Sequence, residues 1–146
     1  MARRMTFKLI TAAIGTVLLA VTAAQAAGSS RGHGVGGRFI NYDPIVAHYN
    51  QSGELFRIEG PCQSACTLFL GIRNVCIERS AVLRFHAGTN RSGVVNRRDT
   101  NHMVAAYNGA LRHYLSEGHH MDTREFYAIS GKDMIQKFGY RECPKR

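Results

Sequence analysis

The sequence predicts an α/β layered domain, because short apolar runs of strand length alternate with segments of helical character. The strand segments are Leu55–Glu59, Val75–Ile77 and Ala81–His86. Between the first two, Ser64–Gly71 has the length and the apolar character of a buried helix, and a glycine at its end suits a helix C-terminus. Alternation of this kind favours strands covered by helices within a single domain.

Helices are predicted on both sides of this central region. Phe39–Gln51 has a weak helical period, and Pro44 suits its first turn. Either Asn41 or Asp43 can serve as its N-cap. Asp99–Leu115 has apolar residues at helical spacing, which predicts one longer helix after the last strand.

The C-terminal part predicts two more helices. Asp122 is suited to open one of them, because Glu125 three residues later completes a capping-box pattern. Ser130 is suited to cap the other, Lys132–Phe138. After it, Tyr140–Cys143 is expected to be a terminal strand or an extended tail.

The chain divides into three parts by composition. Residues 1–26 are typical of a signal peptide, with basic residues before an apolar run from Leu9 and a small-x-small cleavage pattern at Ala24-Gln25-Ala26. Residues 27–35 are rich in glycine and serine and are expected to form a flexible leader. Residues 36–146 then make the single domain. The mature protein is expected to be exported, periplasmic or secreted, without a membrane span.

The net charge of the chain is +9, and it becomes +6 without residues 1–26, which hold three basic residues and no acidic ones. This balance favours a soluble basic surface, and an anionic partner is the alternative. No aromatic-interleaved basic stripe or zinc-finger spacing supports binding of nucleic acid. The pattern predicts no metal and no cofactor, since the cysteines form no CxxC pair.

The four cysteines all follow the predicted signal peptide. In an exported domain they indicate two disulfides, for which three pairings exist. Cys66 lies in the predicted helix and Cys76 at the start of the next strand, so a short loop can bring them together. This spacing favours Cys66–Cys76, which leaves Cys62 for Cys143.

The most informative segment is Gly60-Pro61-Cys62-Gln63-Ser64-Ala65-Cys66. It predicts a strand, a tight turn and a helix that begins near Ser64, so that the serine hydroxyl lies beside helix N-terminal amides. His86 ends the following strand and can act as the base for such a nucleophile. The structural alternatives are a serine that only caps the helix and a histidine that is only buried.

These residues resemble the Clp protease/crotonase superfamily, most closely serine peptidases of the Clp proteolytic-subunit and signal-peptide-peptidase type. The spacing from Gly60 to Ser64 and the strand-end position of His86 match the nucleophile and base of that family. The upstream pair Gly36-Gly37 resembles its oxyanion turn. Ser130-Gly131-Lys132-Asp133 through Phe138-Gly139 resembles its late helix pattern. The cysteine-framed motif also resembles small exported bacterial proteins with reduced versions of this fold.

The resemblance implies a layered Clp/crotonase-like domain in which Ser64 is the nucleophile and His86 the base. The N–H groups of Ala65 and of Gly36 or Gly37 would then form the oxyanion hole. The family's third, acidic residue falls by register near Phe126, which cannot serve, so Asp122 and Glu125 are the nearest candidates.

The function expected from the resemblance is acyl transfer on a peptide or protein substrate by a serine hydrolase. The alternative is a non-catalytic binding or assembly module stabilised by disulfides on the same fold. Family members assemble into rings, so a homo-oligomer is one of the states that the resemblance allows.

Overall fold

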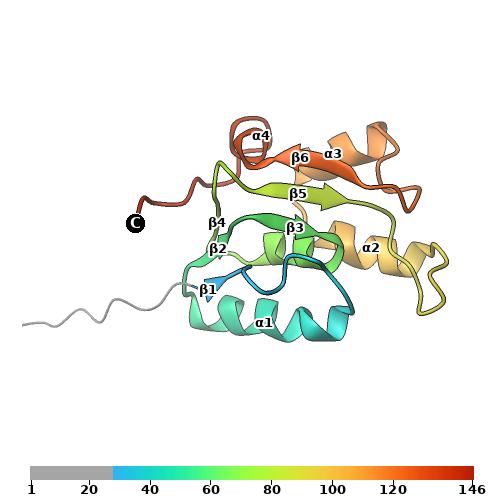
Figure 1. Ribbon diagram of the computed structural model, residues 1–146, viewed down its shortest axis with the longest axis horizontal. Helices are drawn as coiled ribbons and strands as arrows, with labels where there is room; N and C mark the ends of the chain where they lie inside the picture. The colour runs from blue at the N-terminus through green and yellow to red at the C-terminus, as the bar shows by residue number, and fades with distance from the viewer. Residues whose placement is uncertain (1–27) are drawn as a thin grey trace, which may run out of the picture.

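The computed structural model describes residues 28–146, so the predicted signal peptide, residues 1–26, lies outside the described residues. The described chain forms two small sheets with helices packed around them (Figure 1). The α/β class predicted from the alternation of strands and helices is therefore confirmed. No helix in the described part of the chain is both long and apolar enough to cross a membrane.

The strands form two sheets, and the chain passes directly from the first sheet into the second. The first sheet is parallel and has the order β1 (Gly28–Ser29), β2 (Phe56–Ile58), β4 (Val75–Ile77). The second has the order β3 (Pro61–Gln63), β5 (Val82–Phe85), β6 (Tyr127–Ser130). Strands β3 and β5 are parallel, and β6 is antiparallel to β5. The Val82 amide donates to the Gly60 carbonyl at 3.0 Å, which continues the pairing through the bend.

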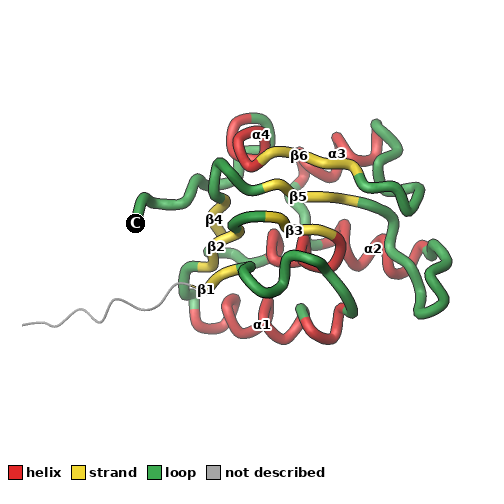
Figure 2. The backbone as a smooth tube through the Cα atoms, viewed as in Figure 1, coloured by secondary structure: helices red, strands yellow, loops and turns green. Residues whose placement is uncertain are grey.

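Part of the predicted flexible leader, residues 27–35, belongs to the folded domain, so this prediction was wrong for its described residues. Gly28 and Ser29 pair with β2, and Ser30 is fully buried. The hydroxyl of Ser30 donates to the Glu59 carbonyl at 3.0 Å and accepts from the Glu59 amide at 2.9 Å. The loop that follows runs beside β3 (Figure 2). Its glycine-rich composition therefore marks a tight path and not a free tail.

The helices of the described chain are η1 (Phe39–Asn41), α1 (Asp43–Ser52), η2 (Ser64–Gly71), α2 (Arg97–Ala105), α3 (Gly109–Glu117) and α4 (Gly131–Gln136). The two η segments are 3-10 helices. Pro44 lies in the first turn of α1 as predicted, but the N-cap residue is Tyr42 and no side chain caps this helix. The predicted cap of α4 is confirmed, since the Ser130 hydroxyl accepts from the Asp133 amide at 3.0 Å.

The predicted helix Asp99–Leu115 is two helices, α2 and α3. The break falls at Asn108, whose side chain accepts from the Leu111 amide at 2.9 Å and so caps the start of α3. The same side chain donates to the Phe138 carbonyl at 2.7 Å. A good N-cap inside a periodic segment thus restarts the helix in a new direction.

The helix predicted to open at Asp122 does not form. Residues 118–126 make turns, and the chain then enters β6, which pairs with β5 from Tyr127 opposite Phe85 to Ser130 opposite Val82. The capping-box pattern of Asp122 and Glu125 is local, and pairing with a strand far away in the chain overrides it.

The core lies between the strands and the helices. Phe69 of η2 packs against Phe56 of β2 with ring centroids 4.5 Å apart, and against Tyr42 at 5.4 Å. On the other side, Phe85 of β5 meets Tyr107 edge-on at 5.4 Å. The 3-10 helix η2 is therefore the central element of the core, and the residue at its start is held by it.

The disulfide pairing predicted from spacing, Cys66–Cys76 and Cys62–Cys143, was wrong. The structure joins Cys62 to Cys66 and Cys76 to Cys143. The tight turn from β3 into η2 brings Cys62 and Cys66 together, with Cα atoms 5.2 Å apart. Two disulfides are consistent with a protein of an oxidising compartment.

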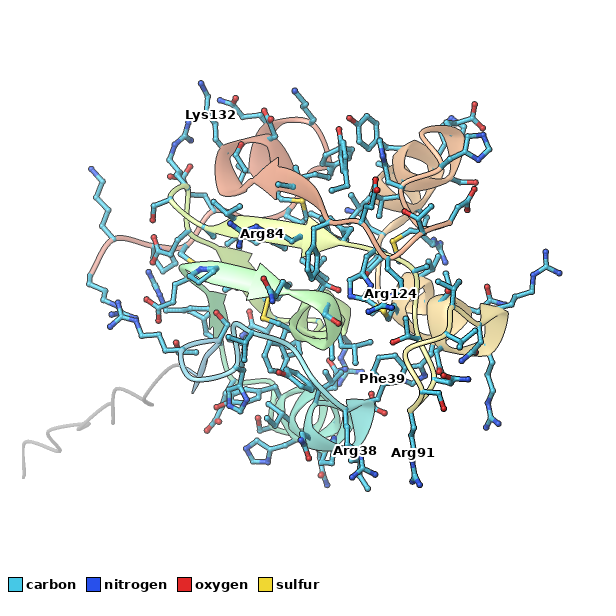
Figure 3. All side chains as sticks on the ribbon, turned by 45° about the vertical axis from the view of Figure 1, so that its right-hand side comes forward. Arg38, Phe39, Arg84, Arg91, Arg124 and Lys132 are labelled. Carbon is cyan, nitrogen blue, oxygen red and sulfur yellow. A yellow bond between two sulfur atoms is a disulfide. The ribbon has the colours of Figure 1, made fainter. Side chains whose placement is uncertain are left out.

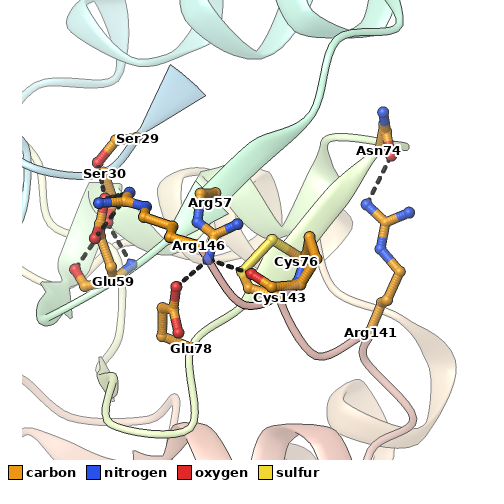
Figure 4. The surroundings of a disulfide bond; sticks show 11 residues. Ser29, Ser30, Arg57, Glu59, Asn74, Cys76, Glu78, Arg141, Cys143 and Arg146 are labelled. Atoms are coloured by element: carbon orange, nitrogen blue, oxygen red, sulfur yellow. Dashed lines mark hydrogen bonds and ion pairs between the residues drawn. A yellow bond between two sulfur atoms is a disulfide. The ribbon is translucent and has the colours of Figure 1, made fainter. Parts of the chain in front are cut away.

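The Cys76–Cys143 bond fastens the C-terminal tail beside β4 (Figure 4). Glu142 forms a parallel bridge with Ile77, so the predicted terminal strand is present as a single bridge. The buried guanidinium of Arg57 pairs with Glu78 and donates to the Pro144 carbonyl at 2.9 Å. Closing a loop of this length is expected to stabilise the domain by about 4 kcal/mol.

A tryptic map of the oxidised protein without reduction tests the pairing. We expect Ile58–Arg73 as a single peptide with both of its cysteines oxidised, because Cys62 and Cys66 lie within it. Asn74–Arg79 should be found joined to Glu142–Lys145. A peptide that joins Ile58–Arg73 to Asn74–Arg79 would contradict the structure.

Candidate active site

Ser64 occupies a strained turn between β3 and η2. Its φ angle is 55°, in the left-handed region that residues other than glycine rarely adopt. The N-cap of η2 is Gln63, with no side-chain cap, so Ser64 does not act as the helix cap. No hydrogen bond of the Ser64 hydroxyl is found among residues 28–146. Such strain is seen at functional sites, where the surrounding structure must hold it.

His86 follows the neighbouring strand directly. Strands β3 and β5 are parallel, with Gln63 opposite Arg84, so Ser64 and His86 leave the same end of two adjacent strands. Adjacent strands lie about 4.8 Å apart, which brings the two residues into one neighbourhood.

Both ring nitrogens of His86 are buried and have no hydrogen-bond partner within the described part of the chain. Burial lowers the pKa of His86, the backbone of Ala87 opposes this shift, and the nearby Arg124 guanidinium adds to it. The neutral ring is therefore favoured, which is the form that can accept a proton. The imidazole is not bonded to Ser64 here, and catalytic contacts of this kind often close only around a substrate.

The loop of Gly36 and Gly37 lies against the Ser64 turn. A Cβ atom added to Gly36 would be 2.6 Å from the Gln63 carbonyl oxygen and 2.7 Å from Ser64 Cβ, so only glycine fits. The Gln63 amide donates to the Gly34 carbonyl at 2.9 Å, which clamps the loop to β3. Gly36 therefore lies against the Ser64 turn, whereas an added Cβ atom on Gly37 would have only the Tyr42 ring within 4 Å.

The two glycines differ as oxyanion donors. The Gly36 amide is engaged with the His33 carbonyl at 3.2 Å. For the amides of Gly37 and Ala65, no acceptor is found among the described residues. Gly37 and Ala65 are therefore the better candidates for an oxyanion hole.

Two interactions with buried residues hold the Ser64 turn in place. The Cys62–Cys66 disulfide spans it, with both cysteines fully buried. The Thr67 hydroxyl is 2.7 Å from the Ser64 carbonyl oxygen and 2.6 Å from the hydroxyl of Tyr107, which is buried in the core. Burial raises the pKa of Tyr107, so this hydroxyl stays protonated and keeps the contact. The turn is anchored both covalently and through the core.

Neither candidate acid forms a hydrogen bond with His86. Asp122 is exposed, and its carboxylate lies 2.8 Å from the Nδ1 atom of His119 in the same turn. Glu125 is exposed as well, and no ion pair or side-chain hydrogen bond of its carboxylate is found in the described chain. The Thr123 carbonyl accepts from the Ala87 amide at 2.7 Å, so the turn does run beside His86 while its carboxylates lie elsewhere.

Phe126 lies against His86 instead. Antiparallel pairing sets Tyr127 opposite Phe85, and the next pair in this register is Phe126 with His86. The two rings meet edge to face with centroids 4.8 Å apart, and Phe126 is 51% exposed. An aromatic ring thus occupies the place where an orienting carboxylate would be useful.

Three contributors to the site were missed by sequence reasoning. Arg124 near His86 and the Thr67–Tyr107 hydrogen bond depend on contacts between distant segments, and no local pattern points to them. The ring contact of Phe126 follows from the β5–β6 register, which the mistaken helix prediction concealed. Within residues 28–146, no cluster of three or more histidine, cysteine, aspartate or glutamate residues is arranged to hold a metal.

Gly36→Ala tests whether the glycine loop supports the Ser64 turn. The new methyl group collides with Gln63 and Ser64, so we expect labelling of Ser64 by a fluorophosphonate probe to fall at least tenfold. Gly53→Ala is the matched control, because Gly53 also has a positive φ but has open space around it. Equal labelling of Gly36→Ala and the parent would contradict the role of the loop.

A comparison of the chain with family models finds no match, and a comparison with curated proteins finds none either.

Proposed function

We propose that the chain is an exported serine hydrolase on a reduced Clp/crotonase-like domain, with Ser64 and His86 as a catalytic dyad. The observation that carries this proposal is the strained φ of Ser64, at the end of the strand that pairs in parallel with the strand before His86. The close approach of Gly36 to the same turn supports it. The two disulfides support an oxidising location.

The reaction is acyl transfer to Ser64 followed by hydrolysis. The Ser64 hydroxyl attacks a peptide or ester carbonyl while the neutral imidazole of His86 takes its proton. The amides of Gly37 and Ala65 stabilise the oxyanion that forms. His86 then returns the proton to the leaving group, and a water molecule activated by the same ring releases the acyl group from Ser64.

The dyad works without a carboxylate in this proposal. Orientation of His86 comes from packing against Phe126. A ring held by packing alone is less strictly oriented than one hydrogen-bonded to an acid, so slow turnover is expected.

The alternative is a non-catalytic binding or assembly module on the same fold. The observation that favours it is the pair of unpartnered ring nitrogens of His86, with Phe126 where an acid would orient the ring. In this case the strained turn of Ser64 serves only to place the start of η2 in the core.

Fluorophosphonate labelling of the oxidised protein separates the two functions. We expect the parent to be labelled, Ser64→Ala to be unlabelled, and His86→Ala to be labelled at least about 100-fold more slowly, because a general base contributes that much. Ser80→Ala and His113→Ala are matched controls at exposed positions and should behave like the parent. An unlabelled parent would favour the binding module.

The pKa of His86 gives a second test, by NMR titration of its ring protons. Since burial lowers this pKa below 6.5, the neutral ring should persist below pH 6.5 as the pH falls. Phe126→Asp places a carboxylate beside the ring and should raise the midpoint by about one pH unit. Phe126→Asn removes the same aromatic ring without adding a charge, so the midpoint of Phe126→Asp should lie above that of Phe126→Asn. An unchanged midpoint in Phe126→Asp would show that residue 126 does not face the ring.

A further inference from the structure

The outer face of β3, β5 and β6 carries positive charge next to the candidate active site. Side chains alternate along a strand, so Arg84 projects from β5 on the face opposite the buried Leu83 and Phe85. Gln63 and Ala128 are its neighbours across the strands. Figure 3 shows Arg84 over the middle of β5 and Arg124 beyond the end of that strand.

Arg124 lies near His86. It is close enough to His86 to disfavour a charged ring, and its guanidinium would be 3.7 Å from a Cβ atom added to Gly93 in the neighbouring loop. Arg84 and Arg124 form no ion pair within residues 28–146, where most arginines are unpaired and only Arg31, Arg57, Arg79 and Arg146 have an acidic partner. Arg124 near His86 and Arg84 on the outer face of β5 are therefore free to meet an anion.

Carboxylates are scarce around this face. The strand positions with outward side chains on β3, β5 and β6 hold no aspartate or glutamate. Asp122 is paired with His119, and Asp133 with Lys137. Glu125 is the nearest acidic residue in sequence to Arg124. This excess of positive charge over negative charge favours an anionic group on a ligand that lies along β5 near the Ser64 turn.

We propose that Arg84 and Arg124 select a peptide that carries a carboxylate beside the bond presented to Ser64. This inference rests on the proposed function, because it names the substrate class of that same site. Arginine suits this role because its planar guanidinium can hold both oxygens of a carboxylate. Phe126, which packs against His86 and is half exposed, offers an aromatic surface for the rest of the peptide.

The test measures binding apart from turnover. Fluorescent peptides are titrated by anisotropy against the oxidised Ser64→Ala protein, so that no acyl transfer follows. One peptide has glutamate at a central position and a second has glutamine there, both with an amidated C-terminus. A third has glutamine and a free C-terminal carboxylate, which distinguishes a side-chain carboxylate from a terminal one.

We expect a peptide with a carboxylate to bind about three- to tenfold more tightly than the amidated glutamine peptide, the range for one or two partly exposed ion pairs. Arg84→Gln and Arg124→Gln should each reduce that preference. Lys145→Gln removes one charge from the exposed C-terminal tail, at the opposite end of the molecule in Figure 1, and should keep it. The preference should shrink as salt is added.

Several results would overturn the inference. Equal binding of all three peptides, or no binding, excludes carboxylate selection. An equal loss with Lys145→Gln would show only an effect of net charge. A single-stranded oligonucleotide that binds more tightly than the acidic peptides and depends on the same arginines would assign the face to nucleic acid instead.

The proposed function is judged separately by labelling of the parent protein. A carboxylate preference without any fluorophosphonate labelling would keep the peptide-binding face and remove the hydrolase. Labelling without the carboxylate preference would keep the hydrolase and remove the peptide-binding face.

Discussion

The parallel pairing of β3 with β5 is the constraint on which the rest of the site depends. It sets Gln63 opposite Arg84, and so it places Ser64 and His86 just beyond the same end of two adjacent strands. A shift of one residue in this register would turn His86 toward the core and Phe85 outward. Because Leu83 and Phe85 are fully buried, that shift would expose apolar surface, and the core therefore fixes the site.

The strained turn at Ser64 is held by its surroundings on three sides. The Cys62–Cys66 disulfide closes it, the Thr67–Tyr107 contact ties its carbonyl to the core, and Gly36 packs against it with no room for a side chain. A positive φ at a residue other than glycine costs about 1–3 kcal/mol. Support from three directions explains how the domain retains that strain. The other disulfide, Cys76–Cys143, fastens the tail and does not touch this turn.

Much of the fold was predictable because its signals are local. The strands at β2, β4 and β5, the helix that starts at Ser64 and the Ser130 cap all follow from residues within a few positions of one another. Most of the errors share one cause. β1, β6 and the Cys76–Cys143 disulfide depend on partners far along the chain, and the capping-box pattern of Asp122 and Glu125 lost to the pairing of β6 with β5. The Cys62–Cys66 disulfide is local, and it was missed because the geometry of the tight turn from β3 into η2 was not foreseen.

The sequence by itself determined the chemistry available at the site: a serine after a short glycine-to-serine spacing, a histidine at a strand end and an upstream glycine pair. The tertiary structure alone decided what surrounds them. It set Phe126 and Arg124 near His86, tied Thr67 to Tyr107 beneath the Ser64 turn, and joined Cys76 to Cys143. The physical reason is that turn and strand preferences act over a few residues, whereas neighbours around a side chain are set by strand register and core packing between distant segments.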